Sequence, residues 1–164
     1  MENDNDYTND QHPVYDDYSD KLKWHKFLIY FALWAGAVLN VINGVRILTG
    51  SAYGNDTDAI YNAFASLQTI DILHGLLMVA LGFYQIYVRF QLAGFRSGAP
   101  GKLSAMYLIT LALNILYLLI VSGVTGIKLG EFMNTNVICA FIESIVFLFI
   151  NKAYYGKRSH LFVN

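Results

Sequence analysis

The sequence has little charge, almost no proline and a single cysteine, Cys139. Charged residues make up only 14% of its 164 residues, whereas an average soluble domain has roughly 25%. One cysteine excludes a disulfide framework and every zinc or iron–sulfur site that needs several cysteines. Both prolines, Pro13 and Pro100, lie outside the long apolar segments. A formal net charge of −1 provides no basic field, so we expect no nucleic-acid partner.

Hydrophobic residues, in contrast, account for 55% of the chain and concentrate in four segments. A transmembrane helix needs about 20 mainly apolar residues, and the segments cover residues 27–48, 67–88, 103–125 and 132–153. The sequence therefore predicts an all-α polytopic integral membrane protein, with four antiparallel transmembrane helices in a lipid bilayer. Because no segment contains proline, we expect continuous helices. A soluble four-helix bundle is the weaker alternative, because its helices would keep a charged outer face.

The start of the chain has a different composition. Its first 20 residues hold seven carboxylates and no lysine or arginine. Such a segment cannot bury enough apolar surface to become ordered, and it lacks the basic start of a signal peptide. We predict a disordered acidic cytoplasmic tail over residues 1–22, a transmembrane domain over 23–155 and a short basic cytoplasmic tail over 156–164. Docking of the tyrosines in the acidic tail onto a partner is the alternative.

Lysine and arginine are distributed unequally around the predicted spans. Nine of the eleven lie on one side: Lys21, Lys23, Lys26, Arg89, Arg96, Lys102, Lys152, Lys157 and Arg158. Only Arg46 and Lys128 lie on the other side. Because cytoplasmic loops carry an excess of Lys and Arg, both termini and the loop at 89–102 are predicted to be cytoplasmic. In size and topology the chain resembles the small four-helix proteins of bacterial cytoplasmic membranes, and we expect it there.

Seven polar or ionisable residues inside the spans are candidate site residues, because ionisable groups cost about 2.5–3.5 kcal/mol at a helix centre and are rare there. They are Arg46, Asp71, His74, Glu143, Asn40, Asn43 and Asn114. At 1.5 Å per residue, the first three and Asn43 lie within about 10 Å of the outer end of their spans, and Asn40 lies at about 12 Å. Asn114 and Glu143 lie at about 16 Å, near the midplane. Helical spacing gives each span one small or polar face, so we expect the four faces to meet at the bundle axis.

Two interpretations of these residues remain open. In the leading one, they hydrogen-bond the helices together: Arg46 pairs with Asp71 or extends outward, and a protonated Glu143 bonds to Asn114 or Asn40. The protein would then be non-enzymatic and act through assembly with itself or a membrane partner. In the alternative, Glu143, Asp71 and His74 form a proton or cation relay in a small transporter.

Other chemistry has little support in the sequence. No phosphate loop, nucleophile elbow or paired zinc ligands occur, so we expect no enzyme activity, no cofactor and no metal. His74 and Met78 share a helix face but are more typical of core packing than of a soft-metal site. Cys139 has no neighbouring base and is predicted to be an ordinary buried thiol.

Overall fold

The computed structural model describes residues 22–133 and 135–163. Apart from Leu22, the predicted acidic tail lies outside these residues. Every regular element in the described ranges is helical, which confirms the all-α prediction. Four helical segments are long and apolar enough to cross a membrane: Lys23–Ala63, Ala65–Ala93, Ala99–Thr125 and Val137–Gly156.

The first segment begins with a continuous run of three elements, namely α2 (Lys23–Phe27), η1 (Leu28–Ala32) and α3 (Leu33–Leu48). Although the run is unbroken, η1 is a π-helix, which the lack of proline did not predict. Arg89 Nε donates a hydrogen bond to the main-chain oxygen of Ile29 at 2.9 Å. A side chain that inserts into the helical hydrogen-bond ladder is a known cause of such local irregularity.

Short helices fill the first and the third connection between the long helices. After Gly50, whose φ of +73° suits glycine, come η2 (Ser51–Asp56) and α4 (Thr57–Ala63). The next long helix is α5 (Ala65–Ala93), and it is followed by α6 (Ala99–Thr125) with Pro100 in its first turn. The remaining elements are α7 (Leu129–Phe132), α8 (Thr135–Gly156) and η3 (Ser159–Leu161).

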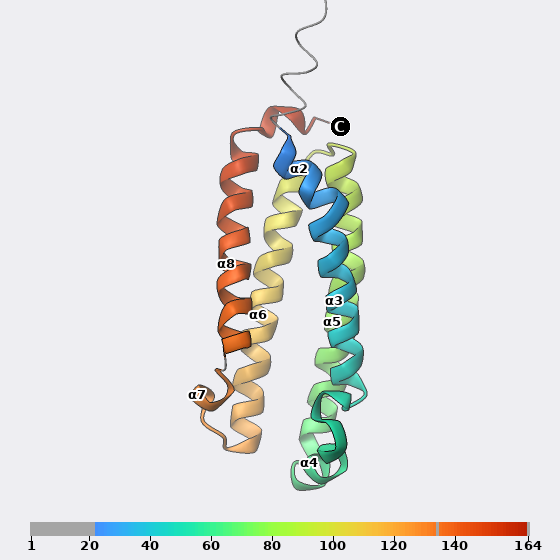
Figure 1. Cartoon of the computed structure of the whole chain (residues 1–164), viewed down its shortest axis with the longest axis vertical. Coiled ribbons are helices and arrows are strands. Elements are labelled where there is room, and N and C mark those ends of the chain that lie inside the picture. The colour runs from blue at the N-terminus through green and yellow to red at the C-terminus, as the bar shows by residue number, and fades with distance from the viewer. Residues whose placement is uncertain (1–21, 134, 164) are drawn as a thin grey trace, which may run out of the picture.

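The long helices pack in series: α3 lies on α5, α5 on α6 and α6 on α8. Figure 1 shows the start of α2, the α5–α6 connection and η3 together at one end of the molecule, which we call the basic end. The opposite end, which we call the loop end, holds α4 and α7 (Figure 1). The sequence predicted that the small or polar faces of the four long helices meet at the bundle axis, and residues of these faces line a cavity between the helices.

Glycines set the closest of these contacts, between α3 and α5. A Cβ added to Gly75 would lie 2.6 Å from the main-chain oxygen of Gly44, and one added to Gly44 would lie 2.8 Å from the oxygen of Gly75. The two backbones are therefore in direct contact, as small residues permit in helix pairs of membrane proteins.

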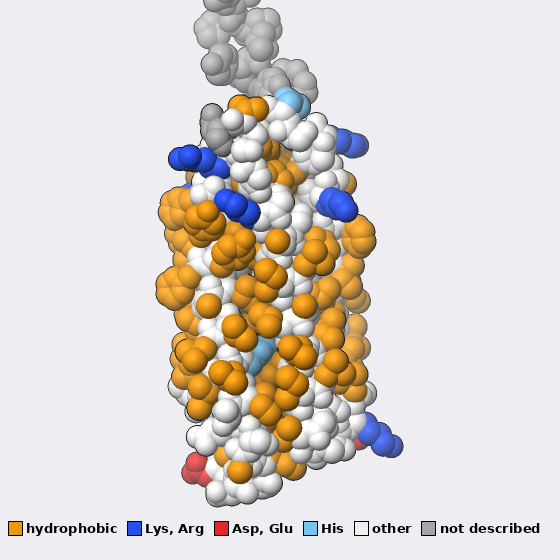
Figure 2. Space-filling view, turned by 180° about the vertical axis from the view of Figure 1, so that it is seen from behind, with side chains coloured by type: hydrophobic (Ala, Val, Ile, Leu, Met, Phe, Trp, Pro, Cys, Tyr) orange, Lys and Arg blue, Asp and Glu red, His pale blue; other side chains and the backbone are white. Residues whose placement is uncertain are grey.

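Buried apolar residues concentrate at the basic end, in one cluster drawn from all the long helices. Its members are Leu28, Ile29, Leu33, Val88, Leu92, Ala99, Leu103, Met106, Tyr155 and Phe162. Elsewhere many large apolar side chains are exposed. Only 6% of the most apolar 18 residues of α6 is buried, and the same fraction holds for α8. Figure 2 shows a broad band of hydrophobic side chains between the two ends, with Lys and Arg mostly near the basic end.

Candidate functional site

A cavity of about 600 Å³ lies between α3, α5, α6 and α8. Five of the seven predicted residues line it: Asn40, Asn43, His74, Asn114 and Glu143. Gln85, Tyr107, Thr110, Tyr117 and Ser144 add further polar groups, and the rest of the lining is mainly apolar. The structure thus brings the polar faces of all four long helices to one site.

Among the described residues that line this cavity, Glu143 is the only charged one. It lies midway along α8 and is exposed, not buried. The predicted hydrogen bonds to Asn114 or Asn40 are not present among the described residues, and the Nδ2 group of each asparagine donates elsewhere. Asn114 Nδ2 donates to the main-chain oxygen of Thr110 at 2.9 Å, and Asn40 Nδ2 donates to Gln85 Oε1 at 2.9 Å. Among the described residues, no hydrogen bond joins Glu143 to either amide, so its carboxyl group is left to face the cavity.

The bond between Asn40 and Gln85 joins α3 to α5 across the cavity wall. Gln85 is 5% exposed and was not among the predicted site residues. Gly36 makes room for it, because a Cβ at this position would collide with the Gln85 amide nitrogen. The sequence did carry a signal for Gln85, since it lies on the same α5 stripe as His74 and Met78.

Asp71 lies outside the cavity lining and is fully buried, at 0% exposed. Its two carboxylate oxygens accept hydrogen bonds from the hydroxyls of Tyr61, at 3.0 Å, and Tyr117, at 2.8 Å. The expected ion pair with Arg46 is therefore replaced by two tyrosines. Arg46 is exposed, in keeping with the alternative in which it extends outward.

His74 follows Asp71 by one helical turn and is 6% exposed. Its ring stacks on the ring of Tyr117, with centroids 4.0 Å apart and planes inclined by 14°. Tyr117 thus binds Asp71 through its hydroxyl and covers His74 with its face. Because Tyr117 and His74 both line the cavity, they connect the buried carboxylate to it.

Contacts between α2 and α8 hold the helices together at the basic end. Trp24 Nε1 donates to Asn151 Oδ1 at 2.9 Å, and His25 Nδ1 lies 2.9 Å from the Tyr155 hydroxyl. The ring of Trp24 also packs on Phe147, with centroids 5.8 Å apart. Phe147 lines the cavity, so Trp24 and Phe147 lie where the cavity comes nearest to the basic end.

Within residues 22–133 and 135–163, no group of three or more His, Cys, Asp or Glu side chains could hold a metal ion. Cys139 is exposed, so the expectation of a buried thiol is wrong. No protein family model, curated protein or solved structure matches this chain.

Proposed function

We propose that this chain is a four-helix integral membrane protein that binds a small cation or a proton in the cavity and acts as a small proton- or cation-linked transporter. The observation that carries the proposal is the cavity itself, where the Glu143 carboxylate is the only charged group among the described lining residues. An ionisable residue within a membrane span is by default a candidate functional group.

Insertion into a bilayer is part of this proposal. A hydrocarbon core is about 30 Å thick, and at 1.5 Å per residue α5 and α6 are each about 40 Å long. Their outward apolar side chains would face lipid, and the Lys and Arg residues would lie at the headgroups. The proposed location is a bacterial cytoplasmic membrane with antiparallel spans. The excess of Lys and Arg at the basic end supports a cytoplasmic location of both termini.

The chemistry of the lining favours a cation over an anion. The neutral lining groups include the oxygens of three asparagines and of Thr110 and Tyr107, and the formal charge of the described lining residues is that of Glu143 alone. Oxygen donors and a carboxylate are suited to a hard cation or a protonated amine. In this account the Glu143 carboxyl group holds either a proton or the cation, which couples the movement of one to the other.

Assembly with a second copy or a membrane partner is the second candidate. It is favoured by the exposure of Glu143 on α8, beside the outward-facing Ile142 and Val146. A polar group at this depth is expensive to leave in lipid, and a helix from a partner could cover it. The two candidates differ in what Glu143 must do, since a covering helix needs a hydrogen-bonding side chain and a transporter needs an ionisable one.

The test is a flux measurement in proteoliposomes that contain a pH-sensitive dye. Na⁺, K⁺ or methylammonium is added outside, and we expect at least one of them to change the internal pH with the wild-type protein. Glu143→Gln should keep the fold, judged by circular dichroism and gel filtration, but abolish the pH change. If Glu143→Gln is tolerated in every assay while Glu143→Leu destabilises the protein or its oligomer, transport is wrong and assembly is supported.

A further inference from the structure

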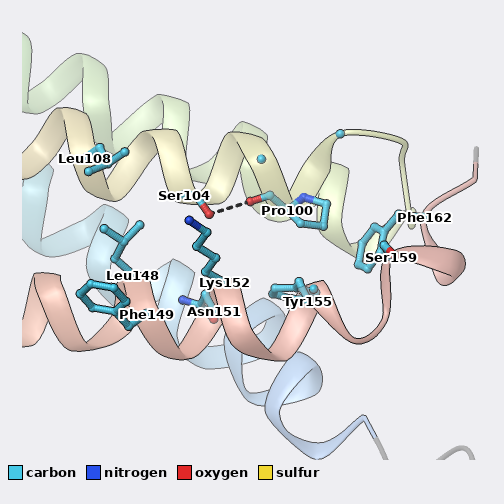
Figure 3. A pocket seen from close by; sticks show the side chains of 13 residues that line it. Pro100, Ser104, Leu108, Leu148, Phe149, Asn151, Lys152, Tyr155, Ser159 and Phe162 are labelled. Carbon is cyan, nitrogen blue, oxygen red and sulfur yellow. Dashed lines mark hydrogen bonds between the residues drawn. The ribbon is translucent and has the colours of Figure 1, made fainter.

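A second cavity, of about 780 Å³, lies between α6 and α8 at the basic end. It shares no lining residue with the Glu143 cavity. The first turns of α6 and the last turns of α8 form its walls, and Ser159 and Phe162 line it beyond the end of α8 (Figure 3). Its volume falls in the range of about 300–1,000 Å³ that is usual for ligand pockets.

The lining of this second cavity changes from apolar to polar along the two helices. Figure 3 shows Leu108, Leu148 and Phe149 toward the middle of the molecule. Closer to the basic end, Lys152 extends from α8 toward Ser104 of α6 (Figure 3). Lys152 is the only charged residue among the described residues of the lining, so these residues combine an apolar section with one cation.

One main-chain N–H at the start of α6, that of Gly101, has no main-chain acceptor among the described residues and lies at the same cavity. The Ala99 N–H before it donates to the main-chain oxygen of Arg96 at 3.1 Å. No side chain caps this helix, Pro100 has no N–H, and the first helical main-chain bond runs from Lys102 N–H to Gly98 O at 3.0 Å. A Cβ added to Gly98 or Gly101 would meet nothing within 4 Å, so this turn is uncrowded. A helix N-terminus of this kind favours an anion.

A buried polar atom in the lining also lacks a partner. Asn151 is 1% exposed and its Oδ1 accepts the bond from Trp24, but its Nδ2 has no hydrogen-bond partner among the described residues. Most buried polar atoms in proteins are hydrogen-bonded, directly or through water. The helix contacts therefore leave this amide donor unsatisfied at the wall of the cavity.

We infer that this cavity binds an anionic phospholipid, with the phosphate beside Lys152 and the start of α6 and an acyl chain along Leu108, Leu148 and Phe149. In the proposed orientation the site lies in the cytoplasmic leaflet, where anionic lipids are attracted to basic residues. The inference rests on the proposed membrane insertion but not on transport through the Glu143 cavity.

The test is native mass spectrometry of the full chain in mild detergent, with phosphatidylglycerol or phosphatidylcholine added. We expect phosphatidylglycerol to bind more tightly, and Lys152→Gln to weaken its binding about fivefold. Lys157→Gln is the matched control, because Lys157 is exposed five residues further on and does not line the cavity. Lys152→Arg should restore binding, and Gly101→Leu should reduce it by filling the space beside the first turn of α6.

Three results would overturn the inference: equal binding of the two lipids, equal effects of the changes at Lys152 and Lys157, or displacement of phosphatidylglycerol by millimolar inorganic phosphate. The last result would mean that the site binds free phosphate rather than a lipid. Glu143→Gln should keep the bound phospholipid even though it should lose flux. A failure of the lipid site and a failure of the transport proposal are therefore distinguishable.

Discussion

The Asp71 carboxylate accepts hydrogen bonds from two tyrosine hydroxyls. Tyr61 comes from α4 at the loop end and Tyr117 from α6, and each hydroxyl donates to a different carboxylate oxygen. Buried carboxyl groups are tolerated when their oxygens are hydrogen-bonded. The two tyrosines therefore explain how a carboxyl group with no exposed surface is accommodated in an apolar segment.

Removal of one hydroxyl tests this role of the tyrosines. Tyr117→Phe keeps the ring that stacks on His74 but leaves one Asp71 oxygen without its donor. We expect a loss of about 1–3 kcal/mol in the free energy of unfolding, measured by unfolding in mixtures of SDS and mild detergent. Tyr30→Phe is the control, because Tyr30 is 69% exposed. Equal stability of the two variants would contradict the account.

For individual residues, the sequence predicted which polar residues form the site but not which residues they would hydrogen-bond. Helical spacing placed Asp71 and His74 on one face, and depth suggested Arg46 as the partner of Asp71. The actual partners are 10 and 46 residues away in sequence, and one of them depends on how α4 folds over the end of α5. Spacing along one helix contains no information on either contact.

The contact between α3 and α5 is the tightest packing between two elements. It depends on Gly44 and Gly75, whose missing side chains allow one backbone to touch the other. The predicted small or polar face of the second span includes Gly75, but that of the first span does not include Gly44. The pairing of these two helices was not predicted, because small residues show which face can approach a neighbour but not which neighbour it meets.

Gly75→Ala should therefore force the two helices apart. Its Cβ would lie 2.6 Å from a backbone oxygen that cannot rotate away, and overpacking of this kind costs about 1–3 kcal/mol. Gly123→Ala in α6 is the matched control, because its Cβ would meet nothing within 4 Å; it should be neutral or stabilising by up to about 1 kcal/mol. Similar losses of unfolding free energy in the two variants would show that close packing is not the reason for a glycine at position 75.

The short elements could not be predicted from periodicity. The π-helix η1 depends on Arg89 of another helix, and α4 and α7 have only seven and four residues. Isolated helices of this length are marginal in water, so contacts with the rest of the molecule decide whether they form. Apolar length, in contrast, is a property of the segment itself, which is why the long helices were foreseeable.

For the whole molecule, the two ends differ in both charge and structure. The basic end holds the buried apolar cluster and most of the described Lys and Arg residues, and the loop end holds two short helices. The cavity between them was foreseen only as a convergence of polar faces. Its open space arises because α3 and α8 stand at opposite ends of the packing series and do not close on each other.

The proposed orientation predicts opposite labelling at two exposed serines, Ser51 in η2 and Ser97 before α6. Each is changed to cysteine in a Cys139→Ser background, because Cys139 is itself exposed. A membrane-impermeant maleimide should label position 51 in intact cells and position 97 only after permeabilisation. The reverse pattern would overturn the topology.

The central claim is that the Glu143 cavity carries a cation or a proton across the membrane. It is tested most directly by the initial rate of internal pH change in proteoliposomes, compared between Glu143→Gln and Glu131→Gln. Both variants lose one exposed carboxylate, but Glu131 lies in α7 and outside the cavity. The account predicts a wild-type rate for Glu131→Gln and the rate of protein-free vesicles for Glu143→Gln. Equal rates in the two variants, or a wild-type rate no greater than that of protein-free vesicles, would contradict it.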